Sequence, residues 1–357
     1  MSVLIIAEAG VNHNGEKAKA LELIEVAANS GADAVKFQTF NAERLAAMSA
    51  PKAAYQQQTT DATESQLAML KALELPVDWH HDLQAHAKKL GIQFISTAFD
   101  LGSLEFLESL DLPFYKIPSG EITNGPLLMA FAQTGKNVIL STGMATLGEV
   151  EQALAVLAWG YNNKELPTSL ADVWKHWSSS QAAVSVEEKV SLLHCTSQYP
   201  TPMEEVNLKA MDTLANSFGL PVGYSDHTQG GLIPVAAVAR GATIIEKHFT
   251  LDRNLPGPDH KASLEPHELS QMVREIREIE TALGDGRKRP QMSEWDTRSA
   301  ARQKIIAITD IAQGAVFTAQ NLSTARTGEG ESPMHIWGFY GKKASRDYRK
   351  GDTIERS

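Results

Sequence analysis

The chain has 357 residues, of which 43% are hydrophobic and 21% charged, so it can build a sizeable folded core. Its formal net charge of −10 argues against a general nucleic-acid-binding surface, although a few lysines in a cleft could still bind a small anion. The single cysteine, Cys195, rules out an intrachain disulfide and fits a reducing compartment. Because Glu8 interrupts the first apolar run and no later run has membrane length, we expect a cytoplasmic protein with no membrane partner.

Short apolar runs alternate with helical patterns along residues 1–285. The apolar runs, each as long as a buried strand, are 3–7, 33–38, 92–97, 114–117, 137–141, 190–195, one ending at 222, and 243–245. Helical periodicity is found at 17–29, 65–73, 78–90, 101–110, 126–133, 147–159, 208–217, 232–240 and 266–283. Eight strands alternating with helices predict a closed (β/α)8 TIM barrel. A doubly wound open sheet is the alternative, but it would gather polar residues at one switch point rather than at nearly every strand end.

Four segments depart from this rhythm. Residues 41–63 predict a long irregular loop over the rim of the sheet, and the length of the loop indicates a function. Residues 160–188 predict a surface insertion with one short helix, packed by its own Trp174 and Trp177. Residues 286–299 predict a linker. Residues 300–357 predict a small β-rich domain, with short strands near 304–308, 315–317 and 351–354, whose small core would gain from docking on another surface.

Two histidines follow the last two predicted strands of the barrel. His227 ends the segment Gly-Tyr-Ser-Asp-His, and His248 lies in Ile-Ile-Glu-Lys-His-Phe. Adjacent parallel strands end at one rim, so we expect both imidazoles to meet there with Asp226, Glu246 and Lys247. Neutral imidazoles bind Mn²⁺ or Zn²⁺, and two of them without a thiolate indicate an open catalytic site rather than a structural one. Two histidines hydrogen-bonded in a core are the alternative.

Lysines and hydroxyls stand at the ends of other strands. Lys36, Lys116 and Lys247 are costly to bury unless they meet an anion, so they predict a phosphate or carboxylate site, unless individual lysines point to solvent. The hydroxyls that would complete this anion site are those of Thr97, Ser119, Ser141 and Ser225.

Other polar residues could act directly on a substrate. Glu8, at the end of the first strand, is a candidate general acid or base or an outer metal partner. Gln38 and Glu121 could hold a polyhydroxylated substrate, although Glu121 could instead cap the helix that follows it. Cys195 has no evident base beside it and is expected to be buried and inert.

Several motifs occur in order along the chain. They are Glu8-Ala-Gly-Val-Asn-His-Asn-Gly15, Val35-Lys-Phe-Gln-Thr39, Tyr115-Lys-Ile-Pro-Ser-Gly-Glu121, Leu140-Ser-Thr-Gly-Met144, Leu193-His-Cys-Thr196, Tyr199-Pro-Thr-Pro202, Ser225-Asp-His-Thr228, Glu246-Lys-His-Phe-Thr250 and Pro256-Gly-Pro-Asp259. The tail adds Asp310-Ile-Ala-Gln-Gly314, Arg326-Thr-Gly-Glu-Gly330 and Ser332-Pro-Met334. The first set resembles the sialic acid synthase family, and the second resembles that family's type III antifreeze-protein-like domain.

The resemblance implies condensation of phosphoenolpyruvate with N-acetylmannosamine and water, giving N-acetylneuraminate and phosphate. The next choice is legionaminate or pseudaminate synthesis from a 2,4-diacetamido-2,4,6-trideoxy hexose, because residues 50–56 and 64–67 resemble all of these members. The resemblance also places a divalent metal on His227 and His248, where it would polarise the sugar aldehyde. Mn²⁺ is typical, with Mg²⁺ or Co²⁺ as alternatives.

The same resemblance assigns roles to further residues. The implied phosphoenolpyruvate ligands are Lys36, Thr97, Lys116, Ser119, Ser141 and Ser225, with Ser197 standing where some members have a phosphate-binding asparagine. The implied sugar ligands are Gln38, Glu121, Tyr199 and Asp259, with Glu8 beside the reacting centre. Arg326 matches an arginine that the small domain inserts into the barrel of the partner subunit, which implies a domain-swapped homodimer.

Two other classes of protein stay open. A barrel metallohydrolase would use the same histidine pair, but with more metal ligands and a bridging carboxylate that we do not find in the sequence. The tail alone suggests a non-catalytic carbohydrate- or ice-binding protein. Metal-dependent turnover would separate a synthase from a binding protein, and dependence on phosphoenolpyruvate would separate it from a hydrolase.

Overall fold

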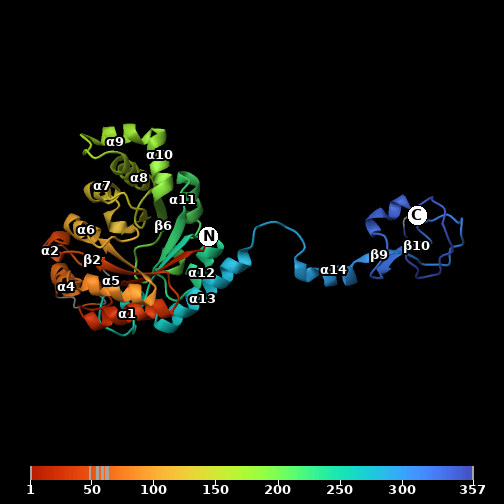
Figure 1. Cartoon of the computed structure of the whole chain (residues 1–357), viewed down its shortest axis with the longest axis horizontal. Coiled ribbons are helices and arrows are strands. Elements are labelled where there is room, and N and C mark those ends of the chain that lie inside the picture. The colour runs from red at the N-terminus through yellow and green to blue at the C-terminus, as the bar shows by residue number, and fades with distance from the viewer. Residues whose placement is uncertain (1, 48–49, 54–55, 58–59, 61–63, 356–357) are drawn as a thin grey trace. The chain divides into compact units, whose positions relative to one another are not determined.

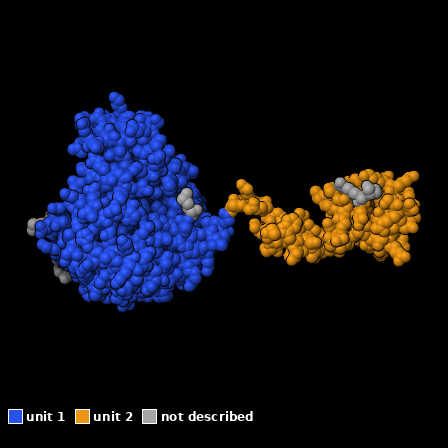
Figure 2. Space-filling model, in the orientation of Figure 1, with its two compact units in different colours: residues 1–284 blue, residues 285–357 orange. Residues whose placement is uncertain are grey.

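The computed structural model describes residues 2–47, 50–53, 56–57, 60 and 64–355. The chain divides into two compact units, residues 1–284 and 285–357 (Figure 2). Each unit has a hydrophobic core of its own. No helix among the described residues is both long and apolar enough to cross a membrane.

The first unit is a barrel of eight parallel strands (Figure 1). They are β1 (Leu4–Gly10), β2 (Ala34–Thr39), β3 (Gln93–Ala98), β4 (Tyr115–Ile117), β5 (Val138–Ser141), β6 (Val190–His194), β7 (Val222–Asp226) and β8 (Ile244–His248). Hydrogen-bonded neighbours follow the order β3-β2-β1-β8-β7-β6-β5-β4, and β3 and β4 lie side by side where the ring closes. The predicted TIM barrel is confirmed, and the open sheet is excluded, because each strand neighbours the strands before and after it.

Helices surround the strands. Those of the first unit are α1 (Lys17–Asn29), α2 (Ala42–Leu45), α4 (Gln66–Leu73), α5 (Trp79–Leu90), α6 (Leu101–Glu108), α7 (Gly125–Gln133), α8 (Leu147–Asn162), α9 (Leu170–Trp177), α10 (Ser180–Lys189), α11 (Ala210–Phe218), α12 (Leu232–Ala239) and α13 (Pro266–Leu283). Short 3₁₀ helices are η1 (Ser119–Glu121), η2 (Met203–Glu205) and η3 (His260–Ala262). The main core fills the layer between strands and helices.

A second apolar cluster explains why polar side chains gather at one end of the barrel. It is formed by Ile6, Ala34, Ile95, Ile139, Leu193 and Ile244, which lie on six of the strands. Side chains two residues apart on a strand share a face. The residues two positions further along these strands are therefore the next layer on the same face, and they are Glu8, Lys36, Thr97, Ser141, Cys195 and Glu246.

The insertion at residues 160–188 differs from its prediction, because it contains the two helices α9 and α10 rather than one. The side chains of Ser169 and Ser179 accept hydrogen bonds from backbone N–H groups in the first turn of each helix. The expected packing by the insertion's own aromatics is also only partial, since Trp177 packs against the main barrel core.

The predicted loop at residues 41–63 is not wholly irregular. It begins with α2, whose cap Asn41 accepts a hydrogen bond from the backbone N–H of Arg44. The substrate-related motif at 50–56 falls partly on residues 54–55, which lie outside the described residues.

The second unit contains η4 (Met292–Glu294), α14 (Trp295–Ala301), β9 (Gln303–Ala307), β10 (Leu322–Arg326) and η5 (Pro333–Gly338). β9 and β10 form a two-stranded antiparallel sheet over a small core. The predicted strand at 304–308 corresponds to β9, but residues 315–317 contribute only an isolated bridge at Val316 and β10 was not predicted. The predicted linker contains η4 and the start of α14, so it is partly helical.

Candidate active site

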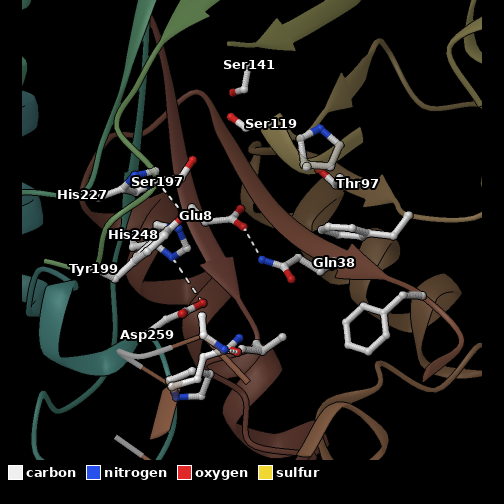
Figure 3. Close-up of a pocket in the computed structure, with 18 of the residues that line it drawn as sticks. Glu8, Gln38, Thr97, Ser119, Ser141, Ser197, Tyr199, His227, His248 and Asp259 are labelled. Carbon is white, nitrogen blue, oxygen red and sulfur yellow. Dashed lines mark hydrogen bonds and ion pairs between the residues drawn. The ribbon is translucent and has the colours of Figure 1, made fainter. Parts of the chain in front are cut away.

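A cavity of about 490 Å³ opens at the carboxyl ends of the barrel strands (Figure 3). This is the end where (β/α)8 enzymes place their chemistry. Most of the predicted site residues line the cavity, namely Glu8, Lys36, Gln38, Thr97, Lys116, Ser119, Ser141, Ser197, Tyr199, Ser225, His227, His248 and Asp259. They come from all eight strands or the loops that follow them.

Two predicted substrate ligands lie elsewhere. Glu121 is not part of the cavity lining, and its carboxylate accepts a hydrogen bond of 2.7 Å from the side chain of Asn124, the residue that caps α7. Arg326 belongs to the second unit, at the exposed end of β10. Its role in the site of a partner subunit stays a prediction.

Hydrogen bonding fixes the ring of His227. Its Nδ1 lies 2.7 Å from the backbone carbonyl oxygen of Thr196, which can only accept, so Nδ1 carries the proton. Nε2 then keeps its lone pair and lies 3.0 Å from the hydroxyl of Tyr199. Burial lowers the pKa of His227 to about 4, so the imidazole is neutral near pH 7.

His248 has a nitrogen that lacks a hydrogen bond. Its Nδ1 is buried without a hydrogen-bond partner among the described residues and lies 3.8 Å from Oδ2 of Asp259. Burial, with smaller contributions from His227 and Lys36, lowers the pKa of His248 well below its usual value. The two imidazole centroids are 5.5 Å apart. The site therefore holds two neutral, adjacent histidines.

These histidines fit an open metal site but not a closed one. No group of three or more His, Cys, Asp or Glu residues in the described part of the chain is arranged to hold a metal ion. Two neutral imidazoles leave the remaining coordination positions to water and substrate oxygens, as catalytic metal ions require. The unpartnered, buried Nδ1 of His248 is consistent with such a ligand.

Glu246 lines the cavity beside the histidines, as expected, although it was not among the predicted substrate ligands. Its carboxylate lies 2.9 Å from Nζ of Lys116 and 3.6 Å from Nζ of Lys36, and it accepts a hydrogen bond of 3.1 Å from Ser225. Burial would raise the pKa of Glu246, but the two lysines outweigh burial and lower it. Glu246 stands two residues before His248 on β8, so strand periodicity puts both on one face and Lys247 on the other.

Glu8 completes this buried ionic network. Its carboxylate lies 2.9 Å from Nζ of Lys36 and accepts a hydrogen bond of 3.1 Å from the side chain of Gln38. Burial raises the pKa of Glu8, and Lys36 opposes that shift. Burial also raises the pKa of Asp259 to about 7, with Glu8 adding to the effect. The cavity thus holds one carboxyl group, Asp259, that can carry a proton near neutral pH, beside a second carboxyl, Glu8, whose pKa is also raised.

Asp226 and Lys247 do not enter the cavity, so their predicted roles at the rim are wrong. β7 and β8 extend through the polar residues that were expected to follow them, and side chains therefore alternate between the two faces. Lys247 Nζ lies 2.5 Å from Oδ2 of Asp226 and also donates to the carbonyl oxygen of Thr228. Lys247 is paired behind the strands and is not available to a substrate anion.

Hydroxyl groups surround Gly143 at the other side of the cavity. A Cβ on Gly143 would lie 2.5 Å from the hydroxyl of Ser197 and 2.8 Å from that of Ser119, so a side chain here would displace these hydroxyls. The hydroxyl of Ser141 is buried without a hydrogen-bond partner among the described residues, and in Figure 3 it lies next to Ser119. Cys195 also lines the cavity, and burial raises the pKa of its thiol, as expected for an inert cysteine.

An apolar surface forms the remaining side of the cavity, and the sequence analysis did not predict it. We call it the apolar wall, and it consists of Phe40, Leu45, Met69, Leu70, Leu73 and Phe99. These residues lie on α2, on α4 and directly after β2 and β3.

The fold and the site together are those of a barrel enzyme whose cavity presents buried lysines and hydroxyls beside two neutral histidines. The NeuB family matches residues 23–288. The N,N'-diacetyllegionaminic acid synthase of Campylobacter jejuni is 49% identical to this chain, and the match covers 98% of each of the two chains. The N,N'-diacetyllegionaminic acid synthase of Legionella pneumophila is 45% identical, and the match covers 99% of this chain and 94% of that one. The crystal structure of an N-acetylneuraminic acid synthetase from Leptospira borgpetersenii, 36% identical, has a TM-score of 0.67 and covers 84% of this chain and 90% of that one.

The chain belongs to the NeuB family, the sialic acid synthase family, as its motifs indicated. Its relatives include synthases of sialic, legionaminic and pseudaminic acids, and they give no support to a metallohydrolase.

Proposed function

We propose that this protein condenses phosphoenolpyruvate with a 2,4-diacetamido-2,4,6-trideoxy hexose and water, giving N,N'-diacetyllegionaminic acid and phosphate. The observation that carries the proposal is the name shared by the two relatives at 49% and 45% identity, which span nearly the whole chain. N-acetylneuraminate synthesis, the first choice from the sequence, becomes the second candidate. It is favoured by the more distant Leptospira structure at 36% identity.

The buried lysines are suited to phosphoenolpyruvate. Lys36 and Lys116 supply positive charge inside a cavity where Glu246 holds both of them in place. The unpartnered hydroxyl of Ser141 and the nearby hydroxyl of Ser119 would donate to phosphate oxygens. Such preorganised donors bind an anion without paying for rearrangement of the site.

His227 and His248 would hold the divalent metal, for which Mn²⁺ is our first choice. When bound, the metal supplies Lewis-acid polarisation of the open-chain sugar aldehyde. The protein's own contribution is to keep both imidazoles neutral and to fix the proton of His227 on Nδ1 through Thr196. Glu8 and Asp259, with their raised pKa values, would hold the protons that the aldehyde oxygen and the sugar hydroxyls exchange.

We further propose that Arg326 reaches the cavity of a partner subunit in a domain-swapped homodimer. Arg326 is exposed on its own unit, and that unit has only a small core. A guanidinium at the cavity mouth would pair with a substrate carboxylate.

The function is tested by mixing the protein with phosphoenolpyruvate, Mn²⁺ and one sugar at a time. The proposal expects phosphate release that requires both substrates, and a product mass equal to the sum of both substrates and water less phosphoric acid. Turnover with N-acetylmannosamine but not with the trideoxy sugar would support the second candidate instead. Phosphate release that needs no sugar would contradict both.

A further inference from the structure

We propose that the apolar wall recognises the deoxygenated end of the sugar, its C6 methyl group, and thereby selects 6-deoxy hexoses over their 6-hydroxy counterparts. This inference rests on the proposed function, because it concerns the substrate of that reaction. It assigns a specificity role to residues of α2 and α4 that contribute no charged group to the cavity.

The order of strands around the barrel fixes which end of the sugar meets the wall. His227 and His248 lie on or directly after β7 and β8, and the sugar aldehyde must lie beside them. β1 and β2 follow in the ring, with Glu8 and Gln38. Figure 3 shows the histidines on one side of Glu8 and Gln38 on the other.

The apolar wall lies beyond Gln38 in the same direction around the barrel. Phe40 and Phe99 directly follow β2 and β3, and α2 and α4 come next along the chain from β2. Of the proposed phosphoenolpyruvate ligands, Lys116, Ser119 and Ser141 belong to β4, η1 and β5. Lys36 and Thr97 stand two residues before Gln38 and Phe99, so they lie one layer deeper in the barrel than the wall. A hexose that has its aldehyde at the histidines and its hydroxyls at Glu8, Asp259 and Gln38 therefore points its last carbon toward the wall.

The wall is firmly supported from behind. Met69 and Leu73 of α4 are 3% and 8% exposed and pack with Phe40 and Val11 in one apolar cluster. Leu45 and Leu70 are half-buried and pack against that cluster. A surface made of packed aliphatic and aromatic side chains stays apolar, because it cannot rotate a polar group toward the ligand.

Desolvation gives the wall its selectivity. A methyl group buried against the wall loses no hydrogen bonds, so its desolvation costs no free energy of that kind. A hydroxyl group in the same place loses its hydrogen bonds to water without replacing them. The amide of Gln66, at the start of α4, also lines the cavity and is the right kind of group to hydrogen-bond the 4-acetamido substituent. The wall and this amide match a sugar that carries an acetamido group at C4 and a methyl group at C6.

The test uses two sugars that differ only at C6, 2,4-diacetamido-2,4,6-trideoxy hexose and its 6-hydroxy counterpart. For the wild-type protein we expect kcat/KM to favour the deoxy sugar by about tenfold or more. Leu70→Thr and Leu45→Thr each add a hydroxyl to the wall and should bring this ratio close to one, with the KM for phosphoenolpyruvate unchanged. Leu67→Thr, on α4 but outside the cavity lining, is the matched control and should keep the wild-type ratio.

Calorimetric binding of both sugars in the presence of phosphoenolpyruvate gives the same ratio where turnover is slow. A wild-type ratio near one would overturn the inference without any variant. A wild-type ratio that persists in both folded wall variants would also overturn it, while leaving the proposed reaction intact. If the proposed function is wrong, the result is different: the protein turns over N-acetylmannosamine and binds neither of the two diacetamido sugars. That result would overturn the inference as well.

Discussion

Lys247 Nζ lies 2.5 Å from Oδ2 of Asp226, and both side chains are fully buried. The two residues are register partners on β7 and β8, on the face of the sheet opposite to the histidines. Asp226 also accepts hydrogen bonds from the backbone N–H and the hydroxyl of Thr228. The pair therefore ties together, from behind, the two strands that carry His227 and His248.

Removing one partner of this pair should be far more damaging than removing both. Asp226→Asn or Lys247→Met alone leaves a buried charge without compensation and should lower the free energy of unfolding by about 3–5 kcal/mol. The double variant should recover most of this loss, because no charge remains. Urea denaturation measures all three values.

The control is Lys71→Met, which breaks the exposed pair of Lys71 and Glu43. That change should cost less than about 1 kcal/mol. Additive losses in the double variant of the buried pair would show that the two side chains do not depend on each other.

Stability should fall on acidification through the buried, neutral histidine His80. Its Nε2 accepts from the hydroxyl of Thr39, since Nδ1 donates to the carbonyl oxygen of Pro76. Burial lowers the pKa of His80 to about 4, compared with 6.5 in the unfolded chain. The unfolded chain thus binds more protons between pH 6.5 and 4, so this contribution is complete above pH 6.5 and is lost as pH falls through 4.

His80→Gln removes one group from that titration. The slope of unfolding free energy against pH should decrease by up to about 1.4 kcal/mol per pH unit in the window from 6.5 to 4. His86→Gln, at a half-buried histidine beside Glu25, is the comparison. An unchanged slope for His80→Gln would show that His80 already carries a proton in the folded protein.

Lys116, which lies 2.9 Å from Glu246, should govern the affinity for phosphoenolpyruvate. Lys116→Met removes a buried cation and should raise the KM for phosphoenolpyruvate by about 10- to 100-fold, the range expected when a hydrogen bond to a charged group is lost. Lys136→Met, at a partly exposed lysine paired with Asp111, should leave this KM unchanged. Steady-state kinetics at saturating sugar separate the two results, and an equal KM in both variants would contradict the anion site.

The histidine pair should bind the metal. His227→Ala should lower the affinity for Mn²⁺ at least about tenfold, and chelation of the wild-type protein should abolish turnover reversibly. His194→Ala, at a histidine of β6 that does not line the cavity, is the control. Metal binding measured by titration calorimetry gives a readout that does not depend on activity. Unchanged metal affinity and rate in His227→Ala would show that the metal assignment is wrong.

Domain swapping predicts that two inactive variants complement each other. Arg326→Ala has an intact barrel, and His227→Ala has an intact Arg326, so a mixed dimer contains one complete site. Equal mixing after unfolding and refolding should restore about a quarter of the wild-type sites. No recovery in mixed samples that sedimentation shows to be dimeric would contradict a site shared between subunits.

The barrel was predictable because eight strand patterns alternate with helical patterns across residues 1–285, and the two departures at 41–63 and 160–188 fall between strands and do not replace one. The error at Asp226 and Lys247 came from ending the strands before their polar residues. If β8 is continued to His248, the alternation of side chains along the strand puts Glu246 and His248 in the cavity. The same alternation puts Lys247 on the opposite face of the sheet. The same period connects each residue of the inner apolar cluster with a site residue further along its strand.

Other features depend on contacts between segments that are distant in the sequence. The apolar wall exists only because α4 packs beside residues that follow β2 and β3, and the helical period of α4 predicts a buried face without saying what it faces. The second helix of the insertion could have been predicted from Ser179, which caps it. The sugar preference could not have been predicted from the sequence, because the motif at residues 50–56 resembles several members of the family.

The proposed reaction is tested most directly by a competition between two sugars. The protein receives equal concentrations of 2,4-diacetamido-2,4,6-trideoxy hexose and N-acetylmannosamine, with limiting phosphoenolpyruvate and saturating Mn²⁺. The ratio of the two nonulosonic acids, measured by mass spectrometry, equals the ratio of their kcat/KM values. We predict that N,N'-diacetyllegionaminic acid exceeds N-acetylneuraminate by about tenfold or more. An equal or larger yield of N-acetylneuraminate would contradict the proposal.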